Sequence, residues 1–372
     1  MRVGVPKEIK THEYRVGLVP SSAGELVHAG HEVVVETGAG AAIGFDDDVY
    51  RAAGASIAES AEAVFAAAEM IVKVKEPQAR EVPMLREGQV LFTYLHLAAE
   101  PELTRGLVGS GCTGIAYETV TGPAGGLPLL APMSEVAGRM AVQVGAHCLE
   151  TEQGGAGVLL GGVPGTPGAR VVVIGGGKVG SNAIRMAVGC EAQVTVLDKS
   201  LSVLERLDDI YGGALRTVFA TREAVDAAVV DADLVIGAVL VPGAAAPKIV
   251  RRDQIGRMRR GSVVVDVAID QGGCFETSRP TTHADPTYVE EGVVHYCVTN
   301  MPGAVARTSA VALNNATLPF VLALANQGAR PAMARDPHLR AGLNVMGGQV
   351  TYKAVAEALG LPYRKAEDAI GI

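Results

Sequence analysis

Apolar and polar positions along this chain follow two alternating patterns. Short runs rich in Val, Ile and Leu are typical of buried strands, and longer stretches between them place apolar residues at helical spacing. In the first 120 residues, helix-like stretches lie at 21–30 and 61–70, between strand-like runs at 1–6, 31–37, 70–77, 89–97 and 111–120. Strands that alternate with helices in this way predict an α/β fold.

A second block of the same kind begins at residue 170. Its strand-like runs lie at 170–175, 193–198, 232–240, 261–270 and 294–300. Beyond residue 310 the stretches 318–328 and 350–360 have helical spacing. We therefore expect terminal helices, without strands of their own, that return to cover the first block.

The length of 372 residues exceeds one ordinary core and predicts two domains. The Gly- and Pro-rich segment 121–132 is a natural connection, and 133–150 has the spacing of a helix that links the two halves. We predict a first domain of residues 1–128 plus 307–372 and a second of residues 129–306. The fold class is α/β, with two doubly wound Rossmann-like domains separated by a cleft.

Composition restricts the class of partner. The net charge of −8 argues against nucleic acid and anionic membranes, which both favour a basic surface. The five cysteines are scattered without CxxC spacing, as expected for reduced thiols. No apolar leader begins the chain, and no run of membrane-spanning length is free of Gly, Pro and charge. We expect a cytoplasmic protein with a small-molecule substrate.

Residues 170–198 have the pattern of a complete strand–loop–helix–strand unit. Gly175, Gly177 and Gly180 have dinucleotide-binding spacing, and Asp198 ends the second strand. The first glycine allows a tight turn, the second lets backbone approach a pyrophosphate, and the third lets helix pack on strand. Asp198 can bind a ribose diol and would repel a 2′-phosphate, which favours NAD over NADP. The alternative is a glycine-rich turn in an ordinary α/β domain.

Charged residues at strand ends are the next candidates, because ligands of open α/β sheets lie beyond the carboxyl ends of strands. Lys75 ends the run 70–77 and can bind substrate, and His96 can transfer protons near neutral pH. Arg15, in a polar loop, offers a planar guanidinium that matches a carboxylate. Taken singly, each has a structural alternative: a solvated edge lysine, a core histidine and a surface arginine.

The run 261–270 ends in Asp270, which is either a turn residue or a catalytic group. Gly272 and Gly273 follow and let the backbone turn sharply. Asp266, deeper in the same run, is expected to be structural. Together, a redox cofactor loop, a histidine, an aspartate, a lysine and an arginine are what dehydrogenation of a small amino or hydroxy acid requires.

In several long segments the chain resembles bacterial alanine dehydrogenases, whose family also holds the NAD-binding subunit of proton-translocating transhydrogenase. The similarity covers nearly all of residues 1–315 and thins beyond about residue 320. It implies reversible NAD-dependent oxidative deamination of L-alanine to pyruvate and ammonium, by a homo-oligomer that is usually a hexamer. The segments are 1–20, 72–77, 91–98, 129–141, 171–180, 237–250, 266–283 and 300–310.

The resemblance also implies roles for individual residues. Arg15 and Lys75 would hold the carboxylate and carbonyl of the substrate in the first domain, and His96 and Asp270 would be the acid/base residues. The second domain would bind NAD. Its NAD site would include Ser134, Gly175, Gly177, Gly180, Asp198, Val239, Leu240, Val267, Ala268, Ile269, Asp270, Arg279, Val298, Thr299, Asn300 and Met301.

Two features depart from the family's pattern. A cation that often follows the ribose-binding acid is missing from its usual place, where Lys199 and Arg206 are the candidates to replace it. The metal-binding acid and histidine of some members are missing from 321–328, so we expect no metal. Cys274 is interpreted as a packed thiol, with redox regulation as the alternative.

Two other functions stay open at this stage. One is a transhydrogenase-like NAD-binding subunit, a branch that lacks the counterparts of His96 and Asp270. The other is a related amino-acid or opine-type oxidoreductase with a larger substrate.

Overall fold

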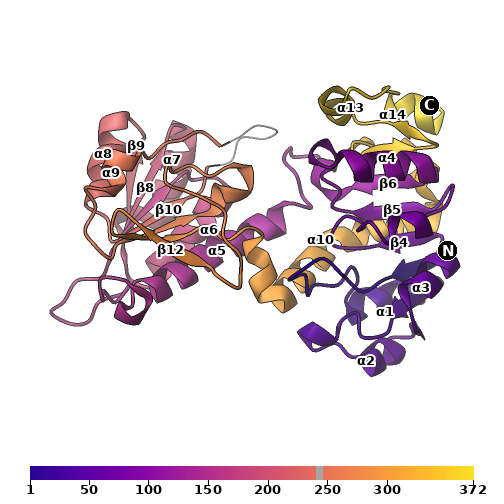
Figure 1. Cartoon of the computed structure of the whole chain (residues 1–372), viewed down its shortest axis with the longest axis horizontal. Helices are drawn as coiled ribbons and strands as arrows, with labels where there is room; N and C mark the ends of the chain where they lie inside the picture. Colours follow the sequence, from indigo (N-terminus) through magenta and orange to yellow (C-terminus); the bar gives the residue numbers. More distant parts are fainter. Residues whose placement is uncertain (240–245) are drawn as a thin grey trace. The chain divides into compact units, whose positions relative to one another are not determined.

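The computed structural model of the chain describes residues 1–239 and 246–372 and divides the chain into two compact units (Figure 1). Unit 1 comprises Met1–Met133 and Val305–Ile372, and unit 2 comprises Ser134–Ala304. The sequence placed these boundaries after residue 128 and before residue 307. Each unit is built on a sheet of its own.

Unit 1 contains an eight-stranded sheet in the order β15-β14-β6-β5-β4-β1-β2-β3. Strands β1 to β6 are parallel, and β1 lies between β2 and β4, which is the doubly wound arrangement. The strands are β1 (Arg2–Val5), β2 (Glu32–Glu36), β3 (Ser56–Ala58), β4 (Met70–Val72), β5 (Val90–Thr93), β6 (Thr113–Ala116), β14 (Leu343–Met346) and β15 (Gln349–Val350).

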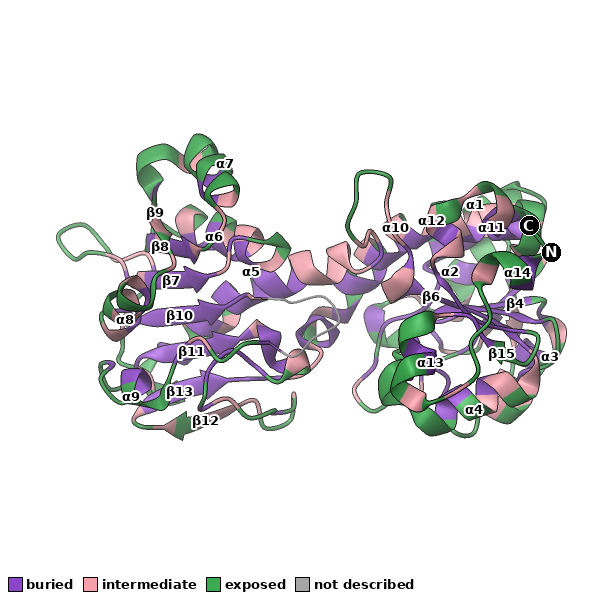
Figure 2. Cartoon of the chain, turned by 90° about the horizontal axis from the view of Figure 1, so that it is seen from above, coloured by how far each residue is buried: buried purple, intermediate pink, exposed green. Residues whose placement is uncertain are grey.

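Helices cover both faces of this sheet, and Figure 2 shows the buried strands between them. One core joins β1, β2 and β4 to the helices α1, α10, α11 and α14, and the other joins β4 and β5 to α3, α4 and α13. The helices are α1 (Pro20–His28), α2 (Asp47–Ala52), α3 (Ala61–Ala67), α4 (Pro101–Ser110), α10 (Ala306–Gln327), α11 (Ala329–Arg335), α12 (Pro337–Arg340), α13 (Lys353–Leu359) and α14 (Ala366–Ile370).

The C-terminal segment departs from the prediction that it holds helices only. It contributes β14, which pairs antiparallel with β6, and β15, which pairs with β14. All four residues of β14 are buried. Gly347 and Gly348, both with positive φ, form the turn between the two strands. Asn344 interrupts the apolar run of β14, so this segment lacks the continuous pattern by which the equally short strand β11 was predicted.

Helix α10 is the long central helix of unit 1. By length and composition the segment Met301–Gln327 could cross a membrane, but the face of α10 that carries Ala310, Leu313 and Val321 is buried in the core of the unit. Asn314 is also buried there and accepts a hydrogen bond from Val19 N at 2.8 Å. This helix is therefore a core helix that ties the C-terminal part of unit 1 to its N-terminal part.

Unit 2 contains a seven-stranded sheet in the order β12-β13-β11-β10-β7-β8-β9. All pairs are parallel except the one between β12 and β13, so this unit is doubly wound as well. Its elements are α5 (Ala131–Cys148), β7 (Arg170–Ile174), α6 (Lys178–Gly189), β8 (Gln193–Asp198), α7 (Leu201–Tyr211), β9 (Leu215–Phe219), α8 (Arg222–Val230), β10 (Leu234–Gly237), α9 (Arg252–Ile255), β11 (Val263–Asp266), β12 (Thr287–Glu290) and β13 (Val293–Tyr296).

The two-residue period of β7 divides the helices of unit 2 between the two faces of its sheet. Val172 belongs to the core that contains α8 and α9. Val173 faces the other side, where its Cγ1 lies 3.4 Å from the Cβ that Gly180 of α6 would carry. Strands β7, β10 and β11 are buried on both faces, which explains why their sequences are nearly continuous in apolar residues.

Candidate active site

The candidate substrate residues of unit 1 follow three of four neighbouring parallel strands. Because β1, β4, β5 and β6 are parallel, the segments that leave their carboxyl ends meet at one edge of the sheet. Arg15 lies on the segment after β1, and Lys75 and His96 lie on the segments after β4 and β5. The structure thus brings the three predicted residues of this unit to one edge.

Arg15 is almost completely buried, with 2% of its surface exposed, so it is not a surface arginine. Its Nε and Nη2 donate to the two carboxylate oxygens of Glu13, and its Nη1 contacts Met133 Sδ at 3.1 Å. Burial opposes ionisation of Glu13, but the hydrogen bonds and charge of Arg15 outweigh it and lower the pKa of Glu13. The guanidinium is therefore a charged, fixed group.

Lys75 is half-buried, and it is not a solvated edge lysine. Burial, followed by the charge of Arg15, lowers the pKa of its ammonium. The loop that carries Lys75 is held by Glu8, which accepts a hydrogen bond from Val74 N at 2.6 Å. The neighbouring Lys73 is completely buried between the carboxylates of Glu8 and Glu81, so it has a structural role.

His96 lies beyond the end of β5 in the left-handed region, at φ 50°. Its side chain is 48% exposed, which excludes the alternative of a core histidine. The carboxylate of Glu118, on the segment after β6, accepts a hydrogen bond from His96 N at 2.6 Å and lies 3.9 Å from Nδ1. The imidazole ring stacks on the ring of Tyr94, with 5.9 Å between centroids.

The sequence did not predict the acidic residues that hold Arg15, His96 and the loop of Lys75. Glu8, Glu13 and Glu118 all lie on segments that leave β1 or β6, and each binds a residue of the candidate site or its loop. The strand-end rule applied to the histidine and lysine would have found Glu118, two residues beyond β6. For Glu13 the available signal was its place two residues before Arg15 in the sequence.

In unit 2 the glycine loop joins β7 to α6. Gly175 has φ +97°, which is unfavourable for a residue with a side chain. A Cβ on Gly180 would lie 1.7 Å from Gly175 O, whereas a Cβ on Gly177 would meet no atom within 4 Å. The loop therefore needs Gly180 for packing. The space beside Gly177 is empty, which suits the close approach of a pyrophosphate to the N-terminus of α6.

Asp198 ends β8 beside this loop. Its carboxylate accepts hydrogen bonds from Gly176 N at 2.7 Å and from Ser200 N at 2.8 Å. Of the two candidate cations, Arg206 donates to Gly176 O and to Ser181 Oγ on the glycine loop, whereas Lys199 is exposed. The geometry and the acid fit a dinucleotide with a free ribose diol.

Asp270 lies in a short 3₁₀ helix, Val267–Gln271, which follows β11. The strand ends at Asp266, so the two aspartates do not share one strand face. Asp270 is exposed and accepts a hydrogen bond from Asn300 N at 3.3 Å. Asp266 is completely buried and accepts hydrogen bonds from Ala268 N and Cys274 N, among others, as a structural acid does.

Two other residues near this turn have defined roles. Gly273 has φ +76°, and a Cβ there would lie 2.5 Å from Asp266 Oδ2, so the sharp turn needs glycine. Cys274 is completely buried, and its Sγ contacts Asp266 Oδ1 at 3.7 Å. Burial raises the pKa of this thiol well above its usual value, which fits a packed cysteine.

Most of the other residues predicted for the NAD site lie just beyond the carboxyl ends of strands in the unit 2 sheet. Val239 follows β10, and residues 267–270 follow β11, as 298–301 follow β13. Ser134 lies on α5. The guanidinium of Arg279 stacks over the ring of Tyr288 at 3.8 Å. Leu240 lies outside the described residues.

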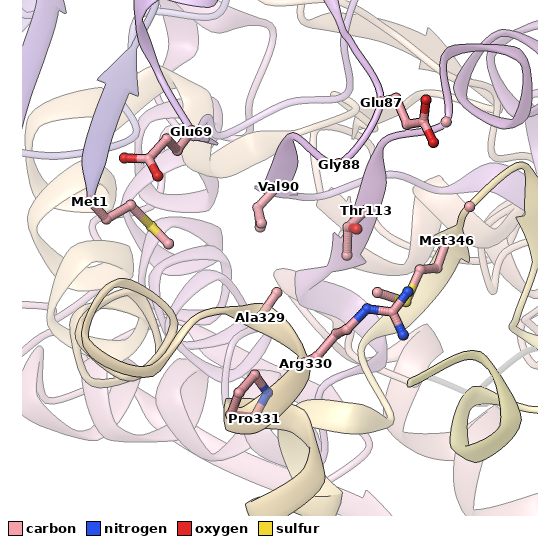
Figure 3. Close-up of a pocket in the computed structure, with 12 residues that line it drawn as sticks. Met1, Glu69, Glu87, Gly88, Val90, Thr113, Ala329, Arg330, Pro331 and Met346 are labelled. Atoms are coloured by element: carbon pink, nitrogen blue, oxygen red, sulfur yellow. The ribbon is translucent and has the colours of Figure 1, made fainter. Parts of the chain in front are cut away.

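Two surface hollows lie at the opposite edges of the sheets. One, of about 420 Å³, is at the amino ends of β1, β4, β5 and β6, where Figure 3 shows Glu69, Glu87 and Arg330 around it. The other, of about 550 Å³, lies at the amino ends of β7 and β8. Neither is lined by the predicted site residues. Among residues 1–239 and 246–372, no three His, Cys, Asp or Glu side chains gather as metal ligands would.

The chain was compared with known proteins. Family models described as alanine dehydrogenase/PNT, N-terminal domain and C-terminal domain, match residues 4–137 and 141–353. An alanine dehydrogenase of Halomonas elongata is 65% identical and one of Methanococcus maripaludis is 54% identical, each over 100% of both chains. A solved L-alanine dehydrogenase has a TM-score of 0.95 at 52% identity, covering 97% of this chain and 99% of that one.

A transhydrogenase structure from Sinorhizobium meliloti has a TM-score of 0.83 at 25% identity, over 94% of this chain and 100% of that one. Two doubly wound units, one with a dinucleotide-type glycine loop, define a two-domain Rossmann-like protein. The chain belongs to the alanine dehydrogenase/PNT family. The predicted fold class of two doubly wound Rossmann-like domains and the resemblance are thereby confirmed.

Proposed function

We propose that this chain catalyses the reversible NAD-dependent oxidative deamination of L-alanine to pyruvate and ammonium. The observation that supports this most is the meeting of Arg15, Lys75 and His96 beyond neighbouring parallel strands of unit 1. Two cations and an imidazole match the carboxylate and reacting α-carbon of a small amino acid. The relatives named alanine dehydrogenase support the same substrate.

Arg15 and Lys75 bind the substrate carboxylate and the carbonyl oxygen of pyruvate. The guanidinium is held rigidly by Glu13, so it is oriented before the substrate arrives. Burial and then the positive charge of Arg15 lower the pKa of Lys75, so the two cations repel each other. A bound carboxylate offsets this repulsion, which makes the pair selective for anionic substrates.

His96 and Asp270 move the protons of the reaction. Oxidation at the α-carbon gives an iminium, water attacks it, and the carbinolamine releases ammonium. His96 is exposed on a left-handed backbone with its ring against Tyr94, so its nitrogens can exchange protons with substrate and water. Asp270 provides a carboxylate at the carboxyl edge of the unit 2 sheet.

A bound NAD would supply the acceptor for the hydride that leaves the α-carbon. Gly175, Gly177 and Gly180 form its pyrophosphate loop and Asp198 binds the ribose. The rest of its site is Ser134, Val239, Leu240, Val267 to Asp270, Arg279 and Val298 to Met301. In this proposal unit 1 is the substrate domain and unit 2 the NAD-binding domain.

We further propose that the protein works in the cytoplasm as a homohexamer. All five cysteines are free, which fits a reducing compartment. The hexamer rests on the family resemblance alone. Light scattering on the purified protein would report its mass directly, and a monomer would contradict this part of the proposal.

The activity is tested by following NADH formation with a panel of amino acids, repeated with NADP. L-alanine and NAD should give the fastest reaction. Asp270→Asn and His96→Ala should each lower kcat by about 10² or more while NADH still binds. Full turnover in either variant contradicts the assignment of that residue.

The two alternatives give different results in the same panel. A transhydrogenase-like subunit would bind NADH but oxidise no amino acid. An opine-type enzyme would reduce NAD with secondary amines of lysine or ornithine rather than with L-alanine. The presence of both His96 and Asp270 favours the dehydrogenase over the first alternative.

A further inference from the structure

His283 lies next to the proposed catalytic centre of unit 2 without a role in it. It is half-buried on the segment that follows the Asp270 turn and precedes β12. Its Nε2 lies 3.2 Å from Asn300 O. A carbonyl oxygen only accepts hydrogen bonds, so this ring nitrogen carries the proton and donates it.

Asn300, which His283 contacts, has an unusual backbone. Its φ is +56°, in the left-handed region that asparagine tolerates better than most residues but not without cost. Its carbonyl oxygen also accepts a hydrogen bond from Gly303 N at 2.9 Å. A Cβ on Gly303 would lie 3.0 Å from Asn300 Nδ2 and 3.5 Å from His283 Nε2, so these three residues are closely packed.

On the other side of the same Cα, Asn300 N donates to Asp270 Oδ1 at 3.3 Å. The left-handed conformation fixes where this N–H points. A residue that holds the carbonyl of Asn300 therefore also holds the donor that faces the Asp270 carboxylate. Asp270 itself is exposed on a short 3₁₀ turn.

We infer that His283 is a positioning residue for Asp270: it donates to the Asn300 carbonyl and so keeps the Asn300 N–H directed at the catalytic carboxylate. This inference rests on the proposed role of Asp270 in the dehydrogenase reaction. It requires the hydrogen-bond donor of His283, not its charge or its ring. A glutamine, whose side-chain amide carries a donor at a similar reach, should replace it.

The test compares His283→Leu with His283→Gln in the full-length protein, using L-alanine and NAD. We expect His283→Leu to lower kcat by about 10-fold with the KM for L-alanine and the Kd for NADH within twofold of the parent. His283→Gln should recover at least half of the lost activity. His147→Leu is the matched control, because His147 is an exposed histidine of the same unit and should leave kcat unchanged.

A double variant tests whether His283 acts through Asp270. In the Asp270→Asn background, followed by single turnover, His283→Leu should cost less than twofold, because its target is already lost. A further 10-fold loss there, or full activity of His283→Leu alone, overturns the inference. So does a His283→Leu variant that no longer binds NADH, which would assign His283 to the fold of the cofactor loops.

The unsubstituted protein separates this inference from the proposed function. If it forms no NADH from L-alanine, the proposed function fails. If it is active and His283→Leu is equally active, the proposed function stands and only the role of His283 fails.

Discussion

Glu118 accepts a hydrogen bond of 2.6 Å from the backbone amide of His96, and the same carboxylate lies 3.9 Å from the imidazole Nδ1. Its two oxygens also accept from Leu95 N, each at 3.2 Å. One side chain at the end of β6 thus holds the left-handed backbone from which the proposed acid/base residue projects. A left-handed residue other than glycine costs about 1–3 kcal/mol and persists only where its surroundings hold it.

We therefore expect Glu118→Ala to lower kcat with L-alanine by about 10–100-fold, because the His96 segment loses its acceptor. Glu118→Gln keeps an amide oxygen as acceptor and should lose less. Steady-state kinetics with an NADH-binding titration checks both. Wild-type kcat in Glu118→Ala would show that the carboxylate does not position His96.

We expect Lys75 to lower the stability of the fold, although it binds the substrate. Burial and the charge of Arg15 place its folded-state pKa below the unfolded value, so folding disfavours the ammonium. This penalty is fully present below the folded pKa. It disappears as pH rises from there to the unfolded value of about 10.4, because over that range the unfolded chain binds more protons than the folded state, and above it neither carries the ammonium.

Lys75→Met should accordingly raise Tm at pH 7 by about 2 °C while abolishing turnover of L-alanine. The gain should shrink as the pH approaches about 10. Lys7→Met is the control, because Lys7 is exposed and should give no gain. A Lys75→Met variant less stable than the parent at pH 7 would mean that the ammonium stabilises the fold.

The glycine loop allows a matched pair of substitutions. Gly180→Ala places a Cβ 1.7 Å from Gly175 O, so helix α6 must move away from the loop, and Tm should fall by about 10 °C or more. Gly177→Ala meets no atom within 4 Å and should fold normally. It should instead weaken NADH binding, because the methyl group occupies the space proposed for the pyrophosphate. Thermal unfolding and an NADH titration separate the two, and the reverse pattern would refute the proposed site.

Asp198 should set the preference between NAD and NADP. Asp198→Asn removes the charge that repels a 2′-phosphate while keeping the size of the side chain. The ratio of kcat/KM for NADP to that for NAD should rise by about 10-fold, mostly through a loss with NAD. Asp208→Asn, an exposed acid on α7, is the control. An unchanged ratio would remove Asp198 from the ribose site.

Most of the fold was accessible from the sequence, but the strands at the sheet edges were not. The edge strands β3, β9 and β12 were missed, because most of their residues are exposed or only partly buried and they form no continuous apolar run. β14 was missed because Asn344 interrupts its apolar run, and β15 because it has only two residues. Central strands such as β7 and β11 are buried on both faces, and their apolar runs predicted them directly.

The candidate site was accessible only in part. Strand ends predicted Lys75, His96 and Asp270, and the family resemblance gave them roles. Nothing local showed that Arg15 is buried or that Glu118 holds His96. The first depends on packing around a loop, and the second joins residues 22 positions apart on segments that follow different strands.

The sequence by itself determined the alternation of strands and helices and the glycine loop, because a two-residue period and the needs of a tight turn are local properties. Only the tertiary structure decided which charged side chains meet. Glu8 reaches Val74 across 66 positions and Asn314 reaches Val19 across 295. The first contact arises because parallel strands distant in sequence end at one edge of a sheet, where a buried charge must find a partner. The second arises because helix α10 packs against the start of α1.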